Sequence, residues 1–118
     1  MTEPTEGGRA AAIAAGYATE GPAIELGSVV LDGVADPTAR VRLPLKMVNR
    51  HGLVAGATGT GKTKTVQVIA EQLSAAGVPV VLADVKGDLS GLSAPGADSD
   101  GLRGRAGETG ADGWTPTG

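Results

Sequence analysis

The sequence predicts an α/β fold, and three neighbouring segments are the reason. A glycine-rich segment, residues 56–63, reads Gly-Ala-Thr-Gly-Thr-Gly-Lys-Thr and fits the phosphate-loop pattern G-x-x-x-x-G-K-[ST]. A short apolar strand over residues 53–55 leads into it, and a helical pattern follows it. A second apolar run, residues 78–83, is rich in β-branched residues and too short for a helix, which is typical of a buried parallel strand.

Residues 1–20 precede any core pattern and are rich in alanine, glycine, threonine and glutamate. We expect a disordered leader here, with a short helix over residues 10–15 as the alternative. Its apolar stretch is brief and follows two glutamates, unlike a secretory signal. No stretch of the chain approaches the roughly 20 apolar residues that cross a membrane. The chain also has no cysteine, which excludes disulfides and cysteine-based zinc sites, so we expect a cytoplasmic protein without a membrane partner.

Residues 21–46 form the next predicted domain, a β-rich N-terminal flap. Two short apolar stretches, 23–31 and 41–45, are separated by the turn signals Asp32-Gly33 and Asp36-Pro37, which favours a β-hairpin. Four basic residues cluster nearby: Arg40, Arg42, Lys46 and Arg50. Such a cluster fits a DNA or phosphate surface, although a solvated face is the commoner meaning of charges at this spacing.

The phosphate loop is the candidate binding site, because a loop that wraps phosphate oxygens must turn several backbone N–H groups inward. Gly56, Gly59 and Gly61 permit the backbone angles that this requires. Lys62 would place its ammonium between the β- and γ-phosphates of a nucleotide, and Thr63 would offer its hydroxyl to Mg²⁺. The predicted cofactors are therefore ATP and Mg²⁺, and the predicted binding residues are Gly56, Ala57, Thr58, Gly59, Thr60, Gly61, Lys62 and Thr63.

The predicted helix after the loop has one apolar stripe, made by Val66, Ile69, Ala70 and Leu73. Gly77 and Pro79 should end this helix. Strand, loop, helix and second strand would form a P-loop NTPase βαβ unit of about 35 residues, part of an incomplete parallel sheet. We assign residues 47–90 to the N-terminal part of a P-loop ATPase core.

Asp84-Val-Lys-Gly-Asp88 follows the second predicted strand, at the edge where open α/β sheets bind ligands. Asp84 is therefore a candidate for a supporting role at the site. The alternative is that Asp84, Lys86 and Asp88 are turn and solvent residues around Gly87. His51 is the only histidine, and a structural role suits it better than metal binding.

Two runs, Asn49–Thr63 and Gly77–Asp88, resemble the HerA-like helicase family. The resemblance is to its bacterial branch, often labelled a domain of unknown function, within the HerA and FtsK group of ring-forming ATPases. It covers residues 42–92 and continues more weakly toward Trp114. It implies ATP-driven movement on DNA by a homo-hexamer, with Gly56 to Thr63 as the nucleotide loop and Asp84 in a motif near the site.

Members of that family run to several hundred residues, so we expect this 118-residue chain to be an N-terminal fragment with a flexible, truncated tail over residues 91–118. No residue is assignable as the catalytic acid. Neither Arg103 nor Arg105 has a context that marks it as the arginine that completes a neighbour's site. Two alternatives stay open: a non-catalytic nucleotide-binding fragment, and a P-loop phosphotransferase, which would need a basic lid and an acceptor site that the sequence does not display.

Overall fold

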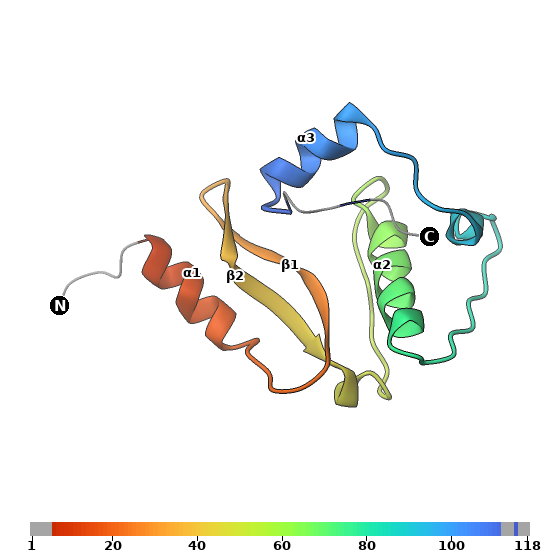
Figure 1. The fold of residues 1–118 in the computed structure, drawn as a ribbon, viewed down its shortest axis with the longest axis horizontal. Coiled ribbons are helices and arrows are strands. Elements are labelled where there is room, and N and C mark those ends of the chain that lie inside the picture. The colour runs from red at the N-terminus through yellow and green to blue at the C-terminus, as the bar shows by residue number, and fades with distance from the viewer. Residues whose placement is uncertain (1–5, 112–114, 116–118) are drawn as a thin grey trace. The chain divides into compact units, whose positions relative to one another are not determined.

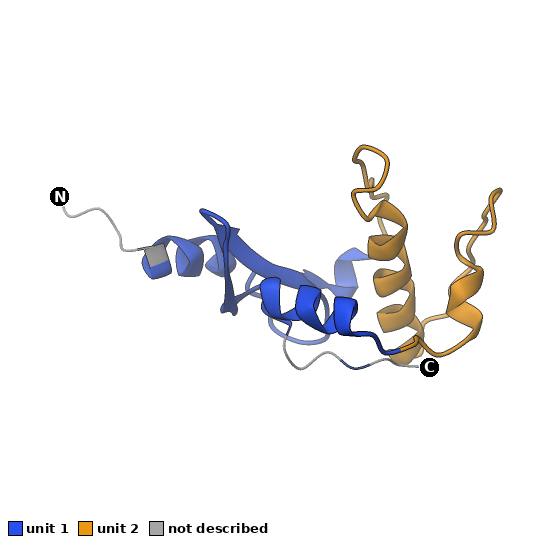
Figure 2. Cartoon of the chain, turned by 90° about the horizontal axis from the view of Figure 1, so that it is seen from above, with its two compact units in different colours: residues 1–48, 98–115 blue, residues 49–97, 116–118 orange. Residues whose placement is uncertain are grey.

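The computed structural model describes residues 6–111 and residue 115 (Figure 1). Within that part the chain is α/β, with one two-stranded antiparallel sheet and three α-helices. The elements in chain order are α1 (Glu6–Ala15), β1 (Ala23–Leu31), β2 (Val34–Pro44), the 3₁₀ turn η1 (Leu45–Met47), α2 (Lys62–Ala75), the 3₁₀ turn η2 (Ser90–Ser93) and α3 (Asp100–Glu108). Two compact units divide the chain, residues 1–48 with 98–115 and residues 49–97 with 116–118 (Figure 2).

In the first unit, β1 and β2 form the hairpin that the sequence predicts. Its turn is Asp32-Gly33, with φ of 48° and 81°, and two positive φ angles are the mark of the type I′ turn that suits a twisted hairpin. The register runs from Leu31 opposite Val34 to Ala23 opposite Pro44. Since β2 begins at Val34, the hairpin is longer than the two apolar stretches suggested.

The second turn signal, Asp36-Pro37, is wrong as a turn between strands, because both residues lie inside β2. The β2 partner of Ser28 is Arg40, whereas the partner of Val29 is Asp36, so the intervening residues bulge out of the ladder. Asp36 Oδ1 accepts hydrogen bonds from the backbone N of Thr38 at 2.9 Å and from its hydroxyl at 2.6 Å. These local bonds satisfy the bulge without ending the strand.

The core of this unit is small and lies between α1 and the hairpin. Ala10, Val29 and Ala39 are buried there, and Ala14, Leu31 and Val41 pack around them. Ala10 and Ala14 lie four residues apart and so share one face of α1, and their small side chains let the helix approach the strands closely. This helix occupies part of the range that the sequence assigned to a disordered leader.

The helix α3 belongs to the same unit and lies within the predicted tail. Ser99 caps its start, with the side-chain oxygen accepting a hydrogen bond from Leu102 N at 3.3 Å. Gly110, just beyond its end, has φ of 71° and is buried, and an added Cβ would lie 3.3 Å from Pro37 Cα. The tail is thus seated against the β2 bulge at Gly110. Trp114 lies outside the described residues.

In the second unit, α2 confirms the helix predicted after the loop. Its end is a left-handed glycine, Gly77, with φ of 82°. Gly77 N donates to Ser74 O at 2.9 Å and Val78 N donates to Leu73 O at 2.9 Å, the paired bonds of a Schellman ending. Pro79 follows, as expected of a sharp stop.

The two strands predicted to flank α2 are not formed in the described part of the chain. Residues 51–57 and 78–84 carry no strand, and no backbone ladder joins them. Leu53 and Val81 are 89% and 96% exposed, whereas the strands of a parallel sheet are buried on both faces. An apolar run becomes a strand only where another strand pairs with its backbone, and neither segment has that partner among the described residues. The βαβ unit therefore stays a prediction.

Candidate functional site

The loop before α2 has a backbone shape that three glycines make possible. Gly59 and Gly61 have φ of 80° and 94°, in the left-handed region that residues with a Cβ rarely adopt. Gly56 is required for a different reason, since a Cβ there would lie 2.6 Å from Thr60 Oγ1. Two geometric causes thus account for the three glycines of the predicted pattern.

The carbonyl of Ala57 holds the loop closed by accepting hydrogen bonds from two residues. Thr60 donates its backbone N–H at 3.3 Å and its hydroxyl at 2.6 Å. Lys62 Nζ donates to the same oxygen at 2.8 Å. The lysine side chain therefore folds back over the loop, so its ammonium lies beside the backbone that would surround an anion.

The start of α2 concentrates positive charge. Gly61 is the N-cap and has no side chain to bond the first backbone N–H groups, which therefore keep their capacity for an external acceptor. Lys62 and Lys64 lie in the first turn, and no acidic residue accompanies them. Cations at this end of a helix are unfavourable because of the helix dipole, so an anion bound here would relieve that repulsion.

Thr63 follows Lys62 in the first turn of α2 and is half-buried. Its hydroxyl makes no hydrogen bond to the rest of the described chain. Thr65, two residues on, bonds instead to Gly61 O through its backbone N at 2.9 Å and its hydroxyl at 3.1 Å. Of the two threonines, Thr63 is thus the one whose oxygen remains able to bind a metal ion.

Asp84 closes a turn with both carboxylate oxygens. Oδ1 accepts from Lys86 N at 3.0 Å and Oδ2 accepts from Leu89 N at 2.7 Å. The Leu89 N–H, followed by those of Lys86 and Gly87, holds the pKa of Asp84 below its ordinary value of 3.8. No hydrogen bond joins Asp84 to residues 56–63 in the described structure. Its contacts are those of the turn residue that the sequence offered as the alternative.

Gln67 is a polar residue that sequence reasoning missed. It lies on α2, one turn after Thr63, and only 8% of it is exposed. Its Nε2 donates to Asp88 O at 3.1 Å, which joins α2 to the turn closed by Asp84. A signal was present, because Gln67 and Ala70 share a helix face and a buried amide requires a hydrogen-bond partner.

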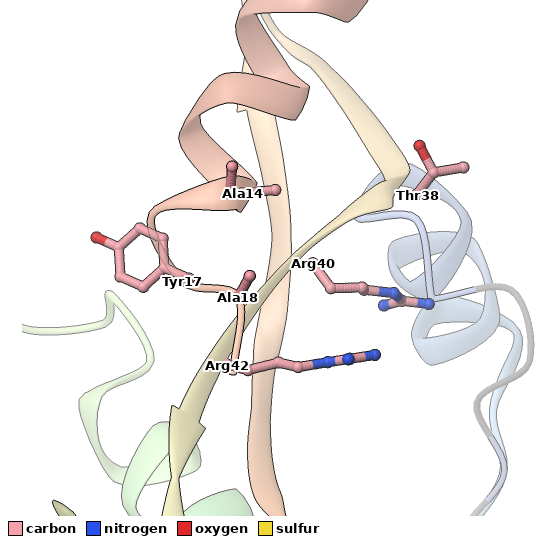
Figure 3. Close-up of a pocket in the computed structure, with 7 residues that line it drawn as sticks. Ala14, Tyr17, Ala18, Thr38, Arg40 and Arg42 are labelled. Carbon is pink, nitrogen blue, oxygen red and sulfur yellow. The ribbon is translucent and has the colours of Figure 1, made fainter. Parts of the chain in front are cut away.

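The basic residues of the hairpin are engaged with their neighbours. Arg42 pairs with Glu25 at 2.6 Å, and Arg40 Nη1 donates to Ser28 Oγ at 3.3 Å. An open hollow of about 280 Å³ lies beside them, lined by Ala14, Ala15, Tyr17, Ala18, Thr38, Arg40 and Arg42. Figure 3 shows the Arg40 and Arg42 side chains extending to the same side, while the Tyr17 ring lies on the opposite side.

The remaining charged candidates form surface pairs. Arg103 forms an ion pair with Asp98, which lies just before α3, and Arg105 pairs with Glu108 within α3 at 2.8 Å. Both arginines therefore form local ion pairs. His51 is exposed, and the described residues hold no group of three metal-ligating acidic, histidine or cysteine side chains. None of the described helices is both long and apolar enough to cross a membrane.

Comparison with known protein families gives a match that includes the candidate site. Residues 30–118, about three quarters of the chain, match the family model described as Helicase HerA-like C-terminal. The match contains the loop, α2 and the Asp84 turn. No curated protein and no solved structure matches the chain.

Proposed function

Because the chain belongs to the HerA-like helicase family, a family of helicases and ATPases, we propose that its loop over residues 56–63 binds the phosphates of ATP together with Mg²⁺. The observation that carries the proposal is the loop itself. Two left-handed glycines shape its backbone, Gly56 leaves room for the Thr60 hydroxyl, and the loop leads directly into the uncapped first turn of α2. Backbone N–H groups, a lysine and a helix dipole are the three sources of positive potential that phosphate loops use.

Lys62 is the residue whose hydrogen-bond partner should change when the nucleotide binds. Its Nζ rests on Ala57 O at 2.8 Å, a neutral acceptor. A phosphate oxygen is a stronger partner for an ammonium because the hydrogen bond is then charged on both sides. We expect the lysine to exchange Ala57 O for the β- and γ-phosphates, while Thr60 keeps its bond to Ala57 O and preserves the shape of the loop.

Thr63 would supply the protein ligand to Mg²⁺, which neutralises phosphate charge when bound. The donor set fits the metal, since a hydroxyl oxygen and phosphate oxygens are hard ligands of the kind that Mg²⁺ prefers. Asp84 enters this proposal as a supporting residue of the neighbouring turn. No described residue is assigned to the activation of water or to the role of an arginine supplied by a neighbour.

The wider function follows from the family and is part of the same proposal. We infer that the chain serves an ATP-driven DNA translocase or helicase that assembles as a homo-hexamer. DNA contact through Arg40, Arg42, Lys46 and Arg50 is a weaker part of it, since the first two are already bonded within the hairpin.

Calorimetric titration of the purified chain with Mg-ATP tests the proposal. Lys62→Ala should abolish the binding heat because it removes the ammonium at the loop. Lys64→Ala is the matched control, since it removes the same charge from the same helix turn at an exposed side chain. Binding that survives Lys62→Ala, or falls equally in both variants, would contradict the assignment of the loop.

A further inference from the structure

Gln67 connects two segments that the sequence marks separately. It lies four residues after Thr63 and three before the buried Ala70, so the same face of α2 carries the metal-binding candidate and this amide. Gln67 is 8% exposed, and its Nε2–Asp88 O bond of 3.1 Å is partly shielded from water, since Asp88 itself is exposed. A shielded amide that loses its partner is costly, so α2 and Asp88 should move together.

Asp88 lies within a turn that several hydrogen bonds cross-link. Asp84 bonds the backbone N–H groups of Lys86 and Leu89, and Ser90 Oγ donates to Gly87 O at 2.8 Å. Gly87 supplies the positive φ of 81° that the turn requires. Because these bonds cross-link the turn, a displacement of the Asp88 carbonyl should also displace the Asp84 carboxylate.

We propose that Gln67 is a positioning residue that couples occupancy of the phosphate loop to the geometry of the Asp84 turn. The proposal rests on the proposed function, since it takes the loop over residues 56–63 as the phosphate site. A phosphate bound at the first turn of α2 fixes that helix, and the Gln67 amide fixes Asp88 in turn. Nucleotide bound in the loop would then hold the Asp84 carboxylate in place, although no hydrogen bond of the described structure joins Asp84 to the loop.

A purely structural Gln67 would behave differently. If its amide only satisfied the packing of α2, its removal would lower the melting temperature and leave the response of the turn to nucleotide unchanged. The discriminating measurement is therefore the effect of a ligand at the loop on the Leu89 N–H, whose acceptor is Asp84 Oδ2.

The experiment uses the full ¹⁵N-labelled chain with Mg²⁺ and the non-hydrolysable ATP analogue AMP-PNP. In the unsubstituted chain, saturation should slow solvent exchange of the Leu89 amide by about fivefold, because the existing bond from Leu89 N to Asp84 Oδ2 would open less often, by a margin equal to the net worth of one hydrogen bond. In Gln67→Met, which keeps a long side chain without the amide, the amides of Gly59 and Lys62 should still respond to the analogue while Leu89 does not. Gln72→Met is the comparison variant, because it removes the same amide from the same helix at a residue whose Nε2 donates to Val68 O and not to the Asp84 turn.

Each outcome separates the two claims. A Leu89 response that persists in Gln67→Met overturns the coupling and leaves the loop assignment standing. No response at Gly59 and Lys62 in the unsubstituted chain overturns the proposed function and the coupling with it. If Gln67→Met fails to fold, Gln67→Glu replaces it, since this variant keeps the shape of the side chain and exchanges the donor for an acceptor. Loss of the Leu89 response in Gln67→Glu supports the coupling, and its retention refutes it.

Discussion

The contact between Gly56 and Thr60 gives a prediction with a calculable size. In Gly56→Ala the new Cβ would lie 2.6 Å from Thr60 Oγ1, a separation that real Cβ atoms do not adopt, so the hydroxyl must move. Moving it breaks the 2.6 Å bond to Ala57 O, an exposed hydrogen bond worth about 0.5–1.5 kcal/mol. An off-rotamer side chain adds about 0.5–1.5 kcal/mol. At about 1.4 kcal/mol per decade, the affinity for Mg-ATP should fall roughly 5- to 140-fold.

A double-mutant cycle tests this reasoning by calorimetric titration with Mg-ATP. Thr60→Ala removes the clashing hydroxyl, and the Cβ of residue 60 would lie 3.5 Å from the new methyl group, an ordinary contact. Gly56→Ala should therefore cost little more affinity in the Thr60→Ala background. Gly52→Ala is the control, since nothing lies within 4 Å of a Cβ at that position. An equal loss from Gly56→Ala in both backgrounds would refute the steric account.

Three further predictions concern stability, pH and turnover. Gly77→Ala should destabilise α2 by about 1 kcal/mol, seen as a lower melting temperature, because φ of 82° strains a residue with a Cβ; an unchanged melting temperature would show that the helix end does not need glycine. Since hydrogen bonds lower the folded-state pKa of Asp84, its contribution is present above the ordinary value of 3.8 and is lost as pH falls through the lowered value, so acid titration should release the Leu89 amide to solvent exchange. Asp84→Asn should remove that acid transition, and its persistence would assign the transition to another group. Finally, the 118-residue chain should show only background ATP turnover against a Lys62→Ala blank. The reason is that no described residue is assigned as the arginine supplied by a neighbour, which contributes about 10³ to 10⁵ in rate. Turnover near about one per second that Lys62→Ala abolishes would contradict this and would make Asp84 and Asp88 the first candidates for the catalytic acid.

The loop and α2 were predictable because their signals are local. The left-handed angles of Gly59 and Gly61 and the helix ending at Gly77 depend on residues only a few positions away. Whether residues 53–55 and 78–83 form strands depends instead on pairing with a distant segment. An apolar run in the sequence does not identify that partner. The helix α2 is therefore confirmed, whereas the phosphate-binding role of the loop and the two flanking strands stay predictions.

The β2 bulge and Gln67 show why other features escaped prediction. Asp36-Pro37 carries the composition of a turn, yet the bonds from Thr38 to Asp36 satisfy the backbone inside a continuous strand. Gln67 was overlooked because an amide next to an apolar stripe resembles a solvated residue. Its burial is explained only once the Asp88 carbonyl, 21 residues away, is found to be its partner.

The location of the bound phosphates is the most direct test of the central claim. Amide shifts of the ¹⁵N-labelled chain should be followed while Mg-pyrophosphate is added, because this ligand has the phosphate chemistry without the base or sugar. We predict that the largest changes fall on Gly59, Gly61, Lys62 and Thr63, which lie in the loop and the first turn of α2. Changes centred on the hairpin at Arg40 and Arg42, with the loop amides unmoved, would contradict it.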